Sequence, residues 1–221
     1  MINDNHVFRS YFDSVMSNDI LQDIVRYVFK GYVEADKLVT SQEYQPGPAK
    51  NCYPYIRWIE IDNNCLALNE RYPGLQTSSE QNIIRNSFHT LISLGNVRIT
   101  VSAVATPWSL PRTAVFRNDL ASCQYRFDIS ADQKRFELRD LENVKDKIVY
   151  AFVIHGPMHD NPRFPGFIYV AFPDDKCMRY LDRINLLKRF PDLIEELQRE
   201  DMIHIPDEAE VKLNVPEGKL L

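Results

Sequence analysis

Two long apolar segments, residues 147–154 and 166–172, constrain the fold of this chain more than any other feature of the sequence. Apolar residues follow one another almost without interruption in both segments, as is typical of strands that are buried on both faces of a sheet. The residues between them, 155–165, are rich in Gly, Pro, His, Asp, Asn and Arg. The sequence therefore predicts two strands at the centre of a sheet, joined by a polar loop at its rim.

Several further segments are predicted to be strands. Apolar and polar residues alternate with a period of two in three of them, which is the pattern of a strand with one buried face. These strands are expected over 97–105, 124–130 and 135–139. A hairpin is also expected over 55–61 and 65–69, although both of these segments also fit a helix.

Amphipathic segments predict helices, because their apolar residues recur every three or four positions. The helices are expected over 18–31, 79–94 and 176–190. Pro191 is expected to open a further acidic helix that ends near Asp201. Strands dominate the middle of the chain and are joined by short connections. The predicted fold class is therefore α+β, with an antiparallel-rich or mixed sheet of about five to seven strands flanked by N-terminal, middle and C-terminal helices.

A proline-rich stretch, residues 41–54, marks the expected boundary between two parts of the chain. Pro and Gly interrupt regular structure, so the stretch is predicted to be a linker. The predicted organisation is an N-terminal helical segment over 1–45, an α+β core domain over 50–190, and an acidic C-terminal helix and tail over 191–221.

The composition is that of a globular protein, with 44% apolar and 26% charged residues. The net charge is −5, and residues 191–221 hold nine acids against three bases. A general nucleic-acid binder usually presents a strongly basic face, so contact with nucleic acid is expected only through a local patch. The polar N-terminus and the lack of a long apolar window predict a cytoplasmic protein without membrane contact.

The four cysteines show no spacing of a zinc site or a disulfide scaffold, and we expect them to be reduced core residues. They are Cys52, Cys65, Cys123 and Cys177. The sequence contains no nucleophile elbow, no glycine-rich phosphate loop and no recognisable set of metal ligands. No metal site is therefore expected, and the cofactor, if the chain uses one, is unknown.

The loop 155–165 holds the candidate catalytic residues His155, His159 and Asp160. An imidazole can serve as a general base or a metal ligand, and a neighbouring carboxylate can orient it. Arg163 is a candidate for binding an anionic group. The alternative is a hairpin connection that is polar only because loops contact water.

Other polar residues admit a chemical role but fit an ordinary surface better. Glu137 with Asp140, and Glu60 with Asp62, are carboxylates of the kind that metal-dependent nucleases use. The residue next to Glu137 in that pattern is Arg139, which does not lose its proton and cannot act as a base. We expect surface carboxylates at these positions. His89, near Arg85, is expected on a polar helix face.

Candidate binding residues lie in two segments. Trp108 sits between Pro107 and Pro111, and it is expected either to fill the core or to anchor an interface. Arg179 and Arg183 are four residues apart and would share one face of the expected helix, where they could contact phosphates. The alternative for that face is simple solvation.

The leading functional hypothesis is a soluble intracellular binding or interaction protein with a protein partner and no catalytic activity of its own. The first alternative is a nuclease-like phosphoester hydrolase that uses the loop from His155 to Arg163. The second is contact with nucleic acid through the segment 176–190.

Overall fold

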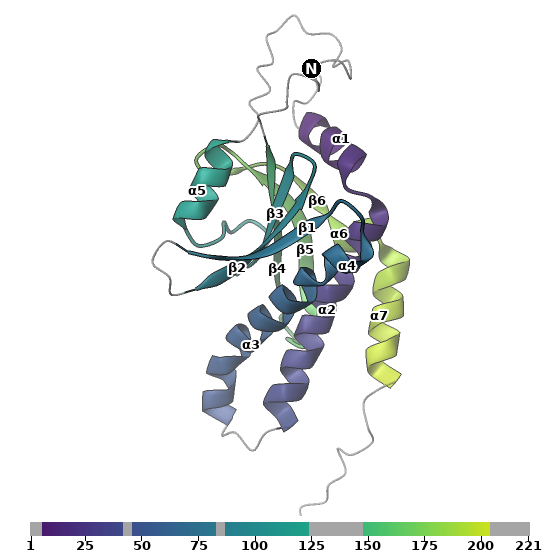
Figure 1. Ribbon diagram of the computed structural model, residues 1–221. Coiled ribbons are helices and arrows are strands. Elements are labelled where there is room, and N and C mark those ends of the chain that lie inside the picture. Colours follow the sequence, from purple (N-terminus) through teal and green to yellow (C-terminus); the bar gives the residue numbers. More distant parts are fainter. Residues whose placement is uncertain (1–5, 42–45, 83–86, 124–147, 204–221) are drawn as a thin grey trace, which may run out of the picture.

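A mixed six-stranded sheet forms the centre of the protein (Figure 1). The computed structural model describes residues 6–41, 46–82, 87–123 and 148–203. The strands are β1 (Gln76–Gln81), β2 (Phe88–Leu94), β3 (Val97–Ala103), β4 (Val149–Pro157), β5 (Pro165–Pro173) and β6 (Tyr180–Asn185), and they lie side by side in chain order. Neighbouring strands are antiparallel except for β3 and β4, which are parallel. The α+β fold class and the central pair of strands are confirmed.

Helices precede, interrupt and follow the sheet. They are α1 (His6–Val15), α2 (Asn18–Ser41), α3 (Pro46–Leu66), α4 (Leu68–Arg71), α5 (Val115–Ser122), α6 (Leu186–Arg189) and α7 (Pro191–Ile203). Figure 1 shows α2 and α3 side by side, with α7 along α2. The helix expected at 18–31 is confirmed and extends to Ser41. The acidic helix after Pro191 is also confirmed.

The main core lies on one face of the sheet, because strand side chains alternate between the two faces. On β4, Val149, Ala151 and Val153 point to this face and pack with residues of α1, α2, α3 and α7. The aromatic residues Tyr150 and Phe152 point to the other face and belong to a smaller cluster that α5 covers. The first face is therefore thickly covered, and the second carries only a thin layer among the described residues.

The helix expected at 79–94 is wrong, because residues 79–81 belong to β1 and residues 88–94 form β2. Gln81 pairs with Phe88, and the backbone amide of Asn82 donates to the carbonyl of Ser87. The apolar spacing favours a helix locally, but pairing of β2 with the buried strand β3 outweighs that preference.

The linker at 41–54 and the hairpin at 55–69 are also wrong where the structure describes them, because residues 46–66 form helix α3. Prolines at the first turn of a helix lose no hydrogen bond, and Pro46 and Pro48 lie there. Ile61, Cys65 and Leu68 follow the helical spacing and are buried in the core. Tertiary burial of this stripe explains why the segment is helical.

The helix expected at 176–190 is a strand, β6, followed by the short helix α6. Its residue Ile184 pairs with Val170 of β5, so the segment completes the edge of the sheet. The strands expected at 124–130 and 135–139, and the acidic tail beyond residue 203, lie outside the described residues. The division of the chain at residues 45 and 190 stays a prediction.

Close packing of α2 on α3 gives a first testable consequence. A Cβ atom at Gly31 would lie only 3.0 Å from the backbone nitrogen of Ile61 and closer still to its side chain. The change Gly31→Ala improves helix propensity but separates the two helices, so we expect it to lower the free energy of unfolding by about 1–3 kcal/mol. Urea unfolding followed by circular dichroism measures this value, and an unchanged or higher midpoint would contradict the packing.

Candidate functional site

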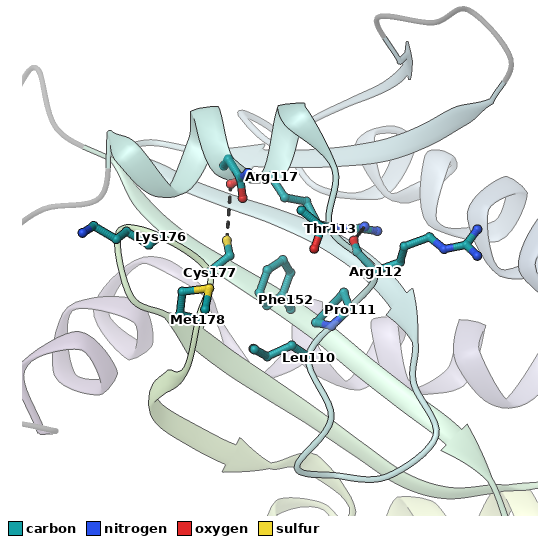
Figure 2. Close-up of a pocket in the computed structure, with 10 residues that line it drawn as sticks. Leu110, Pro111, Arg112, Thr113, Arg117, Phe152, Lys176, Cys177 and Met178 are labelled. Atoms are coloured by element: carbon teal, nitrogen blue, oxygen red, sulfur yellow. Dashed lines mark hydrogen bonds between the residues drawn. The ribbon is translucent and has the colours of Figure 1, made fainter.

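The thinly covered face of the sheet carries the surface with the clearest features of a binding site. The chain leaves β3 at Ala103 and crosses this face as residues 104–114 before it enters α5. The loop between β5 and β6, residues 174–179, lies next to this crossing segment, as Figure 2 shows. The two segments together cover Phe152 of the smaller hydrophobic cluster.

Trp108 stands at the outer turn of the crossing segment, and its side chain is 76% exposed. The turn is fixed by its own hydrogen bonds. The hydroxyl of Thr106 accepts from the amide of Trp108 at 3.3 Å and pairs with the hydroxyl of Ser109 at 2.8 Å. The hydroxyl of Tyr180 donates to the carbonyl of Ser109 at 2.7 Å, which ties the turn to β6.

The guanidinium of Arg183 stacks on one face of the exposed Trp108 indole. Its guanidinium carbon lies 3.6 Å from the centre of the Trp108 ring, and its Nη1 donates to the carbonyl of Pro107. Such stacking of a guanidinium on an indole contributes about 0.5–2 kcal/mol, depending on exposure. Arg9 of α1 supports the strand beneath by donating to the carboxylate of Asp182 and to the carbonyl of Arg183, at 3.0 and 2.9 Å.

These side chains border a shallow pocket of about 270 Å³, which we call the Trp108 surface. It consists of Trp108, Leu110, Met178, Arg179, Tyr180 and Arg183. Three of the four candidate binding residues, Trp108, Arg179 and Arg183, therefore lie together. They meet because β6 runs beside β5, and the helix face that suggested a pairing of the two arginines does not exist. Met178 was missed, because it was expected to face the sheet from a helix.

A second hollow of about 120 Å³ adjoins the Trp108 surface and shares Leu110 and Met178 with it (Figure 2). Cys177 lines it and donates weakly from its thiol to the carbonyl of Arg117 in α5, at 3.6 Å. Its backbone has a φ of 52°, in the left-handed region that favours glycine. Figure 2 shows Lys176 and Arg112 on opposite sides of this hollow, so the basic character extends beyond the Trp108 surface.

The candidate residues of the loop 155–165 do not meet. His155 is buried, and its Nδ1 is hydrogen-bonded to the hydroxyl of Tyr32 at 3.0 Å. Burial, together with the nearby charge of Arg57, lowers the pKa of His155 to about 3, so the ring is neutral. Arg57 itself lies with its guanidinium 4.4 Å from the centre of the Tyr32 ring.

His159 and Asp160 lie at the tip of the loop and are almost fully exposed, with a contact of 2.9 Å between them. Arg163 is turned toward α2, where its Nε lies 3.8 Å from the carboxylate of Asp36. The described residues thus provide no common pocket for His155 and His159, and the phosphoester hydrolase hypothesis stays a prediction. Glu137 and Asp140 lie outside the described residues.

Two other residues differ from their expected settings. His89 lies on strand β2, is 8% exposed and stacks on Phe116 at 3.5 Å between ring centres, so it is not on a polar helix face. Asp62 lies on helix α3 and borders a pocket, so it is not an ordinary surface carboxylate. All four cysteines are free, but only Cys65 is buried in the core, while Cys52 and Cys123 are exposed.

Within the described ranges, no group of His, Cys, Asp and Glu side chains is arranged to hold a metal ion. In the same ranges, every helix is too short or too polar to cross a membrane. Comparison with known proteins finds no matching family model, no matching curated protein and no matching solved structure.

Proposed function

We propose that this chain is a binding module that docks an acidic segment of a partner protein on the Trp108 surface. The observation that carries the proposal is the setting of Trp108, a residue that is 76% exposed although its ring stacks on Arg183 at 3.6 Å. A large aromatic side chain that is mostly exposed at the surface is a typical anchor of a protein interface. A cytoplasmic setting is part of the proposal, and the free cysteines support it.

The rigidity of the turn supports the proposal on thermodynamic grounds. Association costs conformational entropy for every side chain that becomes immobile. Trp108 is already fixed by Arg183, and its turn is fixed by Thr106 and Tyr180. Little further conformational freedom is therefore lost when a partner covers the indole.

The chemistry of the surface indicates an acidic and partly apolar partner. Met178 is 72% exposed beside Trp108, which offers an adaptable apolar contact. Arg179 is also largely exposed, and its contact with Asp174 is long, at 3.6 Å. Exposed positive charge around an apolar centre attracts carboxylates and sets the orientation of the bound segment.

Replacement of Trp108 by alanine tests the proposal directly. Peptides selected from a random display library against the parent protein are expected to be rich in Asp and Glu around an apolar residue. We expect Trp108→Ala to weaken their binding by about thirtyfold or more, because the anchor is lost. Arg179→Gln is expected to weaken binding less and to reduce its salt dependence. Titration calorimetry measures each dissociation constant.

Tyr55→Ala is the matched control, because Tyr55 is an aromatic residue of helix α3 that is 67% exposed. It should leave the binding of the selected peptides unchanged. Peptides that bind equally well to the Trp108→Ala protein would contradict the proposal. Competition of the peptides by oligothymidine, with a steep dependence on salt, would instead favour the nucleic-acid alternative.

A further inference from the structure

A third pocket lies where the two parallel strands end, and it shares Arg112 and Arg117 with the hollow around Cys177. Parallel strands place their carboxyl ends at the same edge of a sheet, and in open α/β sheets ligands bind at such an edge. The ends of β3 and β4 bring Ser102 and His155 to a hollow of about 160 Å³. Helix α3 closes it on one side with Trp58 and Asp62, and the crossing segment with α5 closes it on the other.

The cationic side of this pocket is formed by Arg112 and Arg117. The guanidinium of Arg117 donates to the carbonyl of Arg112 and, at 2.9 Å, to the hydroxyl of Ser102. Its Nε is buried and has no acceptor within the part of the chain that the structure describes. In that same part, neither arginine forms an ion pair. A buried guanidinium nitrogen without an acceptor is unfavourable, and an anion in the pocket would satisfy it.

The anionic side is formed by Asp62. Its backbone carbonyl accepts from the hydroxyl of Thr90 at 3.4 Å, and its carboxylate forms no ion pair among the described residues. Burial raises the pKa of Asp62 to about 6, although hydrogen bonding from Trp58 and Thr90 and the charge of Arg117 oppose that change. At neutral pH the carboxylate is therefore mostly ionised and can accept a further hydrogen bond. His155 adds no charge, because its buried ring is neutral.

We propose that this pocket binds a phosphate ion that still carries a proton. The oxygens of the ion accept from Arg117 and Arg112, and its remaining O–H donates to the carboxylate of Asp62. Sulfate carries no proton at neutral pH. Its oxygens can accept from the arginines, but one of them would face the carboxylate of Asp62, which repels it. The pocket therefore selects hydrogen phosphate over sulfate through the proton of the ligand.

Titration of the parent protein with inorganic phosphate at pH 7, followed by the backbone amide shifts of residues 101–103 and 117, tests the inference. Sulfate at the same ionic strength is the comparison. We expect phosphate to bind about tenfold or more tightly than sulfate, because one buried acceptor remains unsatisfied with sulfate. Arg117→Gln and Arg112→Gln are expected to weaken phosphate binding, and Arg112 is exposed, so its variant is not expected to affect folding. Arg199→Gln, an exposed arginine of α7, is the control that should bind as the parent does.

Asp62→Asn tests the selectivity itself. The Asn amide donates to an oxyanion where the carboxylate repels it, so the preference for phosphate over sulfate is expected to disappear. Methyl phosphate at pH 8 separates the free ion from an ester, because a phosphate monoester has lost its last proton well below this pH, with a pKa of about 6. The ester should then bind as weakly as sulfate, while inorganic phosphate keeps its affinity. No phosphate binding by the parent protein, or equal affinities for phosphate and sulfate, would overturn the inference.

Discussion

Replacement of Gly156 by alanine is expected to lower the free energy of unfolding by about 3 kcal/mol or more. A Cβ atom there would lie 2.5 Å from two ring carbons of Phe167 and 2.7 Å from the carbonyl oxygen of Val104. The backbone of Val104 is itself fixed, because its amide donates to the carbonyl of His155 at 2.9 Å. The carbonyl oxygen therefore cannot move away without breaking the first contact of the crossing segment with β4.

Urea unfolding followed by circular dichroism measures this effect, with Gly47→Ala as the control. Gly47 lies in the first turn of helix α3, and a Cβ atom there would meet nothing within 4 Å. The control is expected to be neutral or slightly stabilising, because alanine is the better helix former. Equal effects of the two changes would show that the contact at Gly156 is not tight. Movement of Val104 would also displace Trp108, so the Gly156→Ala protein should bind selected peptides less tightly.

Acid is expected to destabilise the protein through His155, and Asp62 should mask part of this loss. Above pH 6.5 the ring is neutral in both the folded and the unfolded chain. Below this pH His155 binds a proton in the unfolded chain. In the folded protein the buried ring has a pKa of about 3 and stays neutral. Stability therefore falls by about 1.4 kcal/mol per pH unit from this group, starting near pH 6.5.

Asp62 acts in the opposite direction. Its pKa is about 6 in the folded protein and 3.8 in the unfolded chain, so the folded state holds the extra proton between these values. Stability from this group is gained as the pH falls through 6 and is complete below 3.8. The two effects nearly cancel between pH 4 and pH 6 in the parent protein.

Asp62→Asn should remove the compensation. At pH 7 we expect the variant to be about 2 kcal/mol more stable than the parent, because it buries no charge. As the pH falls, its free energy of unfolding should decrease steadily, and its advantage should vanish near pH 4. Urea unfolding at a series of pH values measures both curves. Parallel curves for the two proteins would contradict the burial of Asp62.

The sequence was most informative where burial and local pattern agree. The apolar runs of β4 and β5 are long enough to require two-sided burial, and α2 has a wide apolar stripe with a strong start at Asn18. The segments at 79–94 and 176–190 have helical spacing as well, but their backbone groups pair with β3 and β5. The local sequence of a segment does not show whether a strand elsewhere in the chain is available to pair with it. The two helix predictions were therefore wrong.

The candidate sites divide in the same way. From the sequence, Trp108 between its two prolines was expected either to fill the core or to anchor an interface. The structure places it at the surface. Its contact with Arg183 joins residues far apart in the chain, which spacing alone does not reveal. His155 lies two residues before the end of β4, and only the position of α2 shows that Tyr32 covers it. Asp62 lay within an expected hairpin, so the sequence did not predict that it borders a pocket between α3 and α5.

The parallel contact of β3 with β4 divides the sheet into two antiparallel meanders, each of which is local in sequence. Each can assemble early, since its strands are joined by short turns. The two meanders join when β3 pairs with β4, which requires closure of the long chain segment between Ala103 and Val149. Because closure of a long loop costs more entropy than closure of a short one, we expect this pairing to form after the meanders. The segment that carries Trp108 belongs to the connection between β3 and β4, so it is placed on the sheet in this same late step. A folding intermediate in which the other strands have already paired would therefore lack the Trp108 surface.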